Sequence, residues 1–364
     1  MSDSARKYRP PVDYIVKTEK PLDELDTPLG RVRIGPYEPG DEHSILDLFK
    51  LVFKVDRSLE QWHWEFRDHP VGMHTYLGKL DDGQVVSQFT GLPARAKVFD
   101  RDLIFSQIVD SMVHPKCREG LKKKGLFALT LLNHSHHFGH LEKECVQMGL
   151  PNPIAYRLGS QTCYYVPMTK AYVHAKELKP AGDLGEPSLE LKGLGNSFRA
   201  ALVEDFSADH DDLWARVKER HRIITWRDRR FWNWRYTRNP HFRYLILELR
   251  DPDSGRLAAT AVCRSEWLGQ PDFAIADLLV DLEMTGAAQA LIKGAEELGR
   301  RTGMSRVVCF LNHNVPESRV FEDEGYMLAP IAFRLVSHSY APDFVTEREL
   351  MHEWYYGLGD FDVI

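Results

Sequence analysis

Residues 62–66 read Trp-His-Trp-Glu-Phe, and residues 232–236 read Trp-Asn-Trp-Arg-Tyr. In each copy a proline follows four residues after the last aromatic, at Pro70 and Pro240, and then come a strand, a glycine turn and a second strand. Two tryptophans, an aromatic, a proline and a hairpin are not expected to recur in one order by chance. The repeat therefore predicts two similar domains in tandem.

The composition fits two soluble domains. A chain of 364 residues exceeds one ordinary core. The 47 basic and 53 acidic residues give a net charge of −6, which provides no broad attraction for nucleic acid. No apolar run approaches the roughly 20 residues that span a bilayer, and the polar N-terminus is not a secretory signal. Five scattered cysteines without a CxxC pair favour a reduced, cytoplasmic chain.

Glycine and proline divide the chain into four parts. Residues 1–30 are predicted as an irregular arm, 31–170 as a first domain, 171–196 as a linker rich in glycine, proline and charge, and 197–364 as a second domain. Within each domain, short β-type runs alternate with segments of helical periodicity. This alternation predicts an α/β (α+β) fold, in which each domain is a mixed, twisted sheet flanked by helices.

The segment 110–130 carries the clearest chemical signal. It reads Asp-Ser-Met-Val-His-Pro-Lys-Cys-Arg-Glu-Gly-Leu-Lys-Lys-Lys-Gly-Leu-Phe-Ala-Leu-Thr, which is a strand end, a basic glycine loop and the start of an apolar helix. Backbone N–H groups and the positive end of a helix dipole would converge there, and that arrangement suits a pyrophosphate. The alternative is a solvated basic turn.

This segment, together with Gly149-Leu-Pro-Asn-x-x-Ala-Tyr156, resembles the GCN5-related N-acetyltransferase (GNAT) superfamily. The resemblance covers residues of about 31–168. It implies that the first domain binds acetyl-CoA or a longer acyl-CoA, with the strand end beside the pantetheine arm and the basic loop around the phosphates. The cofactor-binding residues implied are Met112, Val113, Arg118, Lys122, Lys123, Lys124, Gly125, Leu126, Phe127 and Asn152.

The second domain resembles the same fold without the basic loop. After the strand 273–280, Asp281 and Glu283 occupy the positions where phosphate charge would lie, and like charges there would oppose binding. We therefore expect the second domain to complete the acceptor site or to support the first domain. The whole layout resembles bacterial proteins with two GNAT domains in tandem.

An amine must lose a proton before it attacks a thioester, so a carboxylate or histidine is expected near the reacting atoms. Asp110, on the cofactor strand, is the first candidate for the base, and its alternative is a structural carboxylate. Glu65 is the second candidate, because the second repeat has Arg235 there, and its alternative is a surface residue. Tyr156 is expected to donate the proton to the leaving thiolate, because the tyrosine common in the family is Gly159 here.

Three further patterns favour structural interpretations. His134, His136, His137 and His140 have no acidic or cysteine partner at ligand spacing, so no metal is expected. The Trp-x-Trp pairs are predicted to pack the core, with a wall for a sugar as the alternative. An arginine cluster in the second domain could bind an anionic acceptor or a carrier protein, but such runs are usually solvated faces. Its members are Arg227, Arg229, Arg230, Arg235 and Arg238.

The sequence is thus interpreted as an N-acyltransferase that moves an acyl group from acyl-CoA directly to an amine, without a metal. The acceptor would be a small-molecule amine, an amino sugar or a peptide. Three alternatives stay open. The donor could be an acyl carrier protein, the chain could resemble the tandem Fem transferases that use aminoacyl-tRNA, or both folds could be non-catalytic binding domains.

Overall fold

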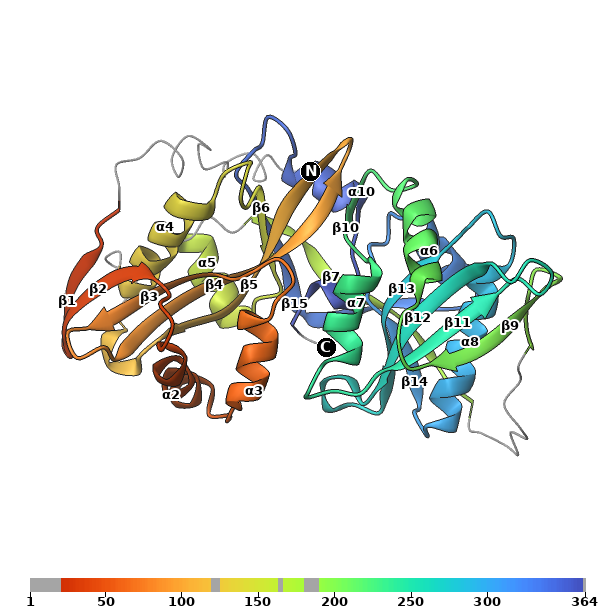
Figure 1. Cartoon of the computed structure of the whole chain (residues 1–364), viewed down its shortest axis with the longest axis horizontal. Helices are drawn as coiled ribbons and strands as arrows, with labels where there is room; N and C mark the ends of the chain where they lie inside the picture. Colours follow the sequence, from red (N-terminus) through yellow and green to blue (C-terminus); the bar gives the residue numbers. More distant parts are fainter. Residues whose placement is uncertain (1–20, 119–124, 163–165, 180–189, 363–364) are drawn as a thin grey trace, which may run out of the picture. The chain divides into compact units, whose positions relative to one another are not determined.

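The structure is a computed structural model that describes residues 21–118, 125–162, 166–179 and 190–362. The chain forms two compact units (Figure 1). Unit 1 comprises residues 1–95, 102–169 and 333–347, and unit 2 comprises residues 96–101, 170–332 and 348–364. Within the described residues, no helix is long and apolar enough to cross a membrane.

Unit 1 is built on a mixed sheet of strand order β1-β2-β3-β4-β5-β6-β15. Neighbours are antiparallel at β1–β2, β2–β3, β3–β4 and β6–β15, whereas β5 and β6 run parallel. The strands are β1 (Glu24–Thr27), β2 (Gly30–Pro36), β3 (His74–Leu80), β4 (Val85–Val98), β5 (Arg101–Val113), β6 (Val146–Gly149) and the C-terminal part of β15 (Met327–Ser339).

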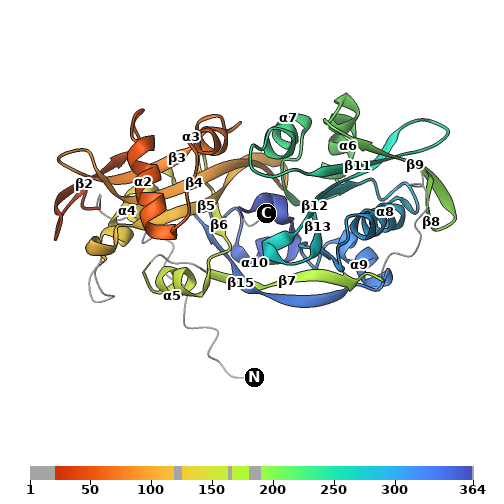
Figure 2. The ribbon, with the colours of Figure 1, turned by 90° about the horizontal axis from the view of Figure 1, so that it is seen from below.

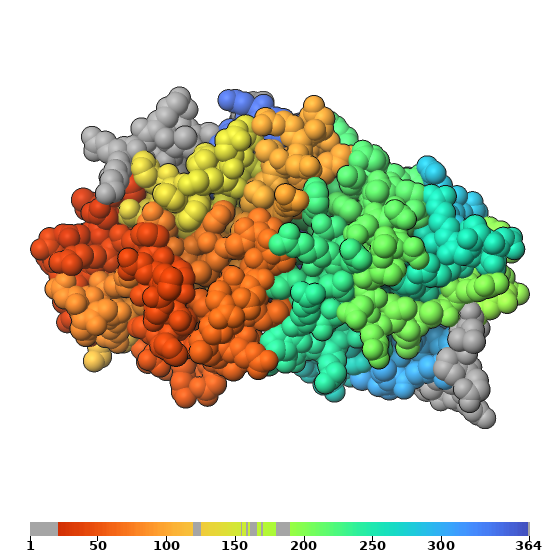
Figure 3. All heavy atoms as spheres, in the orientation of Figure 1, coloured from red at the N-terminus to blue at the C-terminus, as the bar shows by residue number. Residues whose placement is uncertain are grey.

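Helices cover both faces of this sheet. On one face, α2 (Glu42–Phe53) and α3 (Leu59–Trp62) bury a cluster that includes Leu48, Trp62 and Met112. On the other face, α4 (Leu126–Phe138) packs through Leu126 and Leu129, and α5 (Pro153–Thr162) follows β6. Figure 2 shows α3 and α5 on opposite sides of β4 and β5. In the space-filling view, the orange-red segment of α2 and α3 forms part of the surface of unit 1 (Figure 3).

Unit 2 repeats this topology in the order β8-β9-β11-β12-β13-β14-β7, again with one parallel pair, β13–β14. Its strands are β7 (Val166–Glu177), β8 (Glu190–Gly193), β9 (Asn196–Val203), β11 (Leu245–Arg250), β12 (Leu257–Ser265), β13 (Asp272–Val280) and β14 (Arg306–Cys309). Its helices are α6 (Ala208–Lys218), α7 (Arg229–Trp232), α8 (Ala287–Arg301), α9 (Pro316–Asp323) and α10 (Glu347–Glu353). Short β10 (Ile223–Thr225) and β16 (Trp354–Tyr355) pair with each other.

The Trp-x-Trp repeat forms the same structure in both units. A four-residue helix, α3 or α7, continues into a π-helical turn, η2 (His63–Arg67) or η4 (Asn233–Thr237). The side chain of Ser58 or Asp228 caps each helix, by accepting a hydrogen bond from a backbone N–H three residues later. The first tryptophan of each copy, Trp62 or Trp232, is buried, so the packing interpretation is confirmed for these two residues.

The predicted domain boundaries differ from the two units. Residues 171–177, placed in the linker, are part of β7, which pairs with β14 of unit 2. The C-terminal part of β15, placed in the second domain, pairs with β6 of unit 1. Each sheet is therefore completed by a strand that the sequence order assigns elsewhere. Such an exchange leaves no trace in local periodicity, because either sheet satisfies the same alternating pattern.

The end of the predicted arm is also ordered. Glu24–Thr27 pair with β2 through a tight turn, in which the Thr27 hydroxyl donates to the Gly30 carbonyl at 2.8 Å. Pro21 and Pro28 flank this strand and do not interrupt it. Residues 1–20 lie outside the described part of the chain.

Candidate active site

Alternate residues of a strand direct their backbone N–H and C=O groups to opposite edges. Near the end of β5 this alternation shifts by one residue, and we call this the phase shift of β5. The Ile104 carbonyl accepts from the Cys145 N–H at 3.0 Å, and so faces β6, whereas the His114 N–H donates to the Val86 carbonyl at 2.8 Å, and so faces β4. In an unbroken strand, residues ten apart face the same edge. Val109 and Met112, three residues apart, are buried in one cluster, which also requires a shift between them. Asp110 has φ of 47°, and this left-handed residue locates the shift.

The shift leaves part of β5 with an open edge. Pairing with β6 ends at Gln107–Met148, although β5 continues to Val113. Beyond Asp110, the backbone groups of Ser111 and Val113 point away from β4, because those of His114 point toward it. Met112 was expected to contact the cofactor, but it is buried in the core beneath α2 and α3. The open edge can therefore offer backbone donors and acceptors to an extended amide-containing ligand.

The start of α4 lies beside this edge. Val113, Cys117 and Leu126 belong to one apolar cluster, and Phe127 packs against it. Gly125 is the N-cap residue, no described side chain caps the helix, and its first turn has no acidic residue. Among the described residues, no side chain occupies the first N–H groups of α4, and such a helix start suits an anion. The φ of Gly125 is −77°, so its backbone shape does not itself require glycine.

Positive charge gathers at the same place. The Arg118 Nε donates to the Val113 carbonyl at 3.1 Å, which brings these two predicted residues together. Burial, together with Lys116 and Arg118, lowers the pKa of His114 below its ordinary value. Burial is the larger cause of that lowered pKa, and the two nearby cations add to it because they disfavour the imidazolium form. Lys122, Lys123 and Lys124 lie outside the described residues.

The two predicted bases share one arginine. The guanidinium of Arg57 binds both oxygens of Asp110, with Nη2 at 3.2 Å from Oδ1 and Nη1 bonded to Oδ2. The Glu65 carboxylate lies 3.6 Å from the same guanidinium, and all three side chains are about 90% buried. The sequence prediction missed Arg57, although the repeat contained a signal, because Arg227 occupies the corresponding place in the second copy.

Asn152 and Tyr156 are the two residues expected at the thioester end of the donor. The structure gives Asn152 a structural role and does not assign a role to Tyr156. The Asn152 Oδ1 accepts from the Ala155 N–H at 2.9 Å, so this side chain caps α5. The sequence interpretation did not include this capping role, and the cofactor contact expected of Asn152 stays a prediction. Tyr156 is half-buried on α5, and the guanidinium of Arg334 lies 5.0 Å from its ring centroid. Arg334 comes from β15, and local sequence around α5 could not have indicated it.

The histidines of α4 do not form one group. His134 is fully buried, with its Nε2 at 3.1 Å from the His74 carbonyl and 3.7 Å from Glu144, whereas His136 and His137 are exposed. Among the described residues, no three potential ligands are placed to hold a metal ion. His134 is part of the unit 1 core rather than of the candidate site.

In unit 2, backbone atoms of the same unit cover the start of α8, which corresponds to the start of α4 in unit 1. Helix α8 begins after Gly286, and strand β8 packs directly on that start, since a Cβ on Gly286 would lie 1.9 Å from the Gly193 carbonyl oxygen. The charge argument from the sequence was wrong for Asp281. Its carboxylate is neutralised by Arg216 at 2.8 Å, Arg256 at 3.5 Å and Arg220 at 3.6 Å.

The arginine cluster of unit 2 is only partly a surface. Arg227 is 1% exposed and bonds to Asp277 and Asp360, and Arg235 donates to the Phe361 carbonyl. The interpretation of these two residues as a solvated or carrier-binding face was therefore wrong. Arg229, Arg230 and Arg238 are the exposed members of the cluster.

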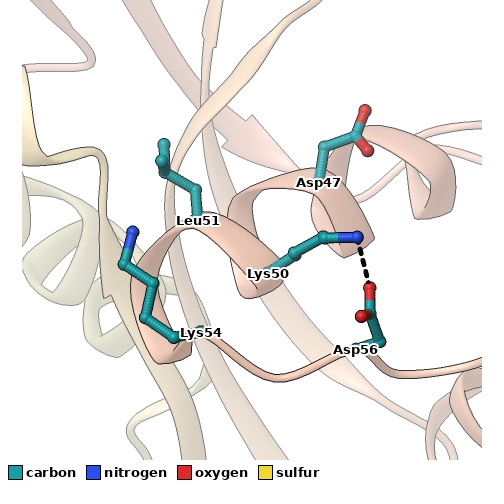
Figure 4. Close-up of a pocket in the computed structure, with 5 residues that line it drawn as sticks. All are labelled: Asp47, Lys50, Leu51, Lys54 and Asp56. Atoms are coloured by element: carbon teal, nitrogen blue, oxygen red, sulfur yellow. Dashed lines mark ion pairs between the residues drawn. The ribbon is translucent and has the colours of Figure 1, made fainter.

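A shallow hollow of about 460 Å³ lies beside the C-terminal end of α2 (Figure 4). Its lining residues are Asp47, Lys50, Leu51, Lys54 and Asp56. Lys50 and Asp56 form an exposed ion pair across it at 2.7 Å. The two aspartates and the two lysines that line the hollow balance in charge, so the hollow would not select a ligand by its charge. We therefore do not relate it to the β5 edge.

Comparison with known proteins identifies the class. Residues 33–159, which contain the β5 edge and the start of α4, match the model of the acetyltransferase (GNAT) domain. This segment is similar to a GNAT acetyltransferase domain, and that similarity supports an acyltransferase enzyme. No curated protein sequence shows significant similarity to the chain.

Solved structures with the same fold extend over both units. A protein of Enterococcus faecalis, described as a probable N-acyltransferase, has a TM-score of 0.57 at 13% identity, over 85% of this chain and 72% of its own. N-myristoyltransferase from Saccharomyces cerevisiae, solved with bound myristoyl-CoA, has a TM-score of 0.53 at 12% identity, over 88% of this chain and 80% of its own. At these identities the likeness concerns the fold.

Proposed function

We propose that the protein is an N-acyltransferase whose unit 1 binds acyl-CoA and transfers the acyl group directly to an amine. The observation that carries this proposal is the open edge of β5 beside the start of α4, which no described side chain caps. The edge suits the pantetheine amides, and the helix start suits the pyrophosphate. The GNAT match over the same residues supports the assignment.

The residues divide between three parts of the donor. The backbone of Ser111 and Val113 would bind the pantetheine arm and the thioester carbonyl. Arg118 and the N–H groups at Gly125–Phe127 would hold the phosphates, with Lys122–Lys124 adding charge. Asn152 and Tyr156 would border the sulfur, next to the first turn of α5. Arg118 would exchange its bond to the Val113 carbonyl for the phosphates, because a guanidinium prefers an anion to a neutral oxygen.

The chemistry needs only a proton acceptor and a proton donor, because a thioester is already activated. The amine nitrogen forms a bond to the acyl carbon, the carbon–sulfur bond breaks, and the thiolate takes up a proton. We assign the proton acceptor to Glu65, directly or through water, and the proton donor to Tyr156. Backbone N–H groups on β5 would stabilise the oxyanion.

We also propose that the two units are tandem GNAT folds, of which only unit 1 binds the donor. Three observations support this. The strand orders of the two units are equivalent, the α3–η2 turn of unit 1 is repeated as α7–η4 in unit 2, and the solved structures match 85–88% of the chain. The Gly193–Gly286 contact in unit 2 leaves no room for a phosphate at the start of α8. Unit 2 would then support unit 1 or help to bind the acceptor, which would be a small-molecule amine, an amino sugar or a peptide.

Calorimetric titration with CoA, acetyl-CoA and longer acyl-CoAs tests the donor site. We expect one acyl-CoA per chain, bound at least tenfold more weakly by Gly125→Glu, which is a loss of about 1.4 kcal/mol or more. A carboxylate at a helix start stabilises the helix but repels phosphate, so the variant should stay folded. Gln84→Glu, in the exposed β3–β4 turn, is the control for added charge. If the wild type binds none of these compounds, the proposal fails.

A further inference from the structure

We propose that Arg57 and Asp110 form a clamp that holds the phase shift of β5, and that Asp110 acts as a positioning residue rather than as the base. This inference rests on the proposed donor site, because the clamp would maintain the edge that binds the acyl-CoA. It begins from the backbone of Asp110, whose φ of 47° is unfavourable for a residue that has a Cβ.

The side chain of Asp110 is committed to Arg57. Both of its oxygens bond to the guanidinium, in the paired geometry that gives the strongest ion pairs. Arg57 is itself fixed, because its guanidinium lies 3.9 Å from the ring centroid of Phe49 and 5.4 Å from that of Phe66. The pair therefore ties the strained residue to the turn between α2 and α3.

Unit 2 contains the same device. Arg227 stands 170 residues after Arg57, and each arginine directly precedes the N-cap residue of the Trp-x-Trp helix. Arg227 donates from Nε to the Asp277 Oδ1 at 2.8 Å. Asp277 also adjoins an irregularity, because β12 pairs Val262 with Asp277 but Cys263 with Ile275. Each unit thus places an arginine–aspartate pair where its strand shifts phase.

The two pairs differ in a way that fits their roles. In unit 2, Asp277 also accepts from the Tyr236 hydroxyl, and Asp360 also binds Arg227. Both members of this pair therefore have additional protein partners. In unit 1, the shift opens onto the edge where Ser111 and Val113 present their backbone groups. A shared clamp is therefore structural in unit 2 and supports ligand binding in unit 1.

The test compares two substitutions of Asp110 by calorimetry with acetyl-CoA. Asp110→Gly removes the carboxylate but adopts a positive φ readily, whereas Asp110→Val keeps the volume and resists it. We expect Asp110→Val and Arg57→Met to bind acetyl-CoA about tenfold more weakly, and Asp110→Gly to stay within about threefold of the wild type. Arg57→Met should cause no further loss in the Asp110→Gly background. Lys50→Met, which breaks the exposed pair with Asp56, is the control and should change nothing.

Amide hydrogen exchange provides a readout that does not need the ligand. Exchange at residues 111–113 should become faster in Arg57→Met and Asp110→Val, and should be unchanged in Lys50→Met. If Asp110→Gly binds as weakly as Asp110→Val, or if Arg57→Met changes neither binding nor exchange, the clamp is refuted. If the wild type binds neither acetyl-CoA nor any longer acyl-CoA, the donor proposal fails, and the exchange experiment alone decides the clamp.

Discussion

Substitution of Gly286 by alanine should destabilise unit 2 by an amount that the local geometry determines. A Cβ at this position would lie 1.9 Å from the oxygen and 2.4 Å from the carbon of the Gly193 carbonyl. Ordinary contact begins near 3.4 Å, so β8 must retreat by more than about 1 Å. Because both contacting groups are backbone, no side chain can rotate away to relieve the overlap.

The cost has two parts. Gly286 has φ of 87°, and a left-handed conformation costs an alanine roughly 1–2 kcal/mol. Separation of β8 from α8 adds an overpacking cost of about 1–3 kcal/mol. We therefore expect the free energy of unfolding of unit 2 to fall by about 3 kcal/mol. Gly255→Ala is the matched control, because Gly255 has φ of 71° with nothing within 4 Å of its Cβ position, and should show the backbone cost alone.

Urea denaturation followed by tryptophan fluorescence measures this difference. The probe reports mainly on unit 2, which contains six of the eight tryptophans. They are Trp214, Trp226, Trp232, Trp234, Trp267 and Trp354. If Gly286→Ala costs no more than Gly255→Ala, the start of α8 is not tightly covered, and the steric reason for our proposal that unit 2 does not bind the donor is wrong.

Two further predictions concern catalysis and pH. Glu65→Gln should lower the rate of acyl transfer from acetyl-CoA to a panel of amines by about 100-fold, because a general base usually contributes at least that factor, and should not change acetyl-CoA affinity. The rate is measured as thiol release, and an unchanged rate would exclude Glu65 as the base. Burial lowers the pKa of His174, His210 and His338 from 6.5 to about 4, so the unfolded chain binds more protons than the folded chain between these values. Stability should therefore be complete above pH 6.5 and fall as the pH drops toward 4, and a constant urea midpoint between pH 7 and 5 would contradict this.

The sequence indicated the repeated Trp-x-Trp turns because this repeat is local. Two tryptophans, a proline and a hairpin specify one helical turn and the strands that follow, and both copies fold accordingly. The exchange of β7 and β15 was not predictable in the same way. Pairing between strands that are 129 or more residues apart depends on which edge is available, and alternating hydrophobicity does not identify the edge.

The candidate site was only partly accessible from the sequence. Val113, Arg118 and the start of α4 were correctly expected to be neighbours, since a strand and the helix that follows it meet at one end of the sheet. The cap role of Asn152 was recognisable, because asparagine before a helix is a common signal. The sequence did not reveal that Arg57 binds Asp110, because 53 residues separate them and only the fold brings them together.

The two units differ in what covers the start of the helix after the shifted strand, which is α4 in unit 1 and α8 in unit 2. Both units have the strand order, the phase shift and the arginine–aspartate pair that would build a GNAT donor site. In unit 2 the hairpin of β8 and β9 reaches the start of α8, where Asn196 donates to the Thr285 carbonyl at 2.9 Å and Gly193 meets Gly286. In unit 1 the equivalent hairpin is β1–β2, and Leu25 and Leu29 pack on the side of the α4 cluster through apolar contacts. The helix start is closed by backbone in unit 2, whereas in unit 1 no described side chain caps it. If unit 1 binds the donor as proposed, this difference is sufficient to confine the donor to unit 1 while both folds are retained.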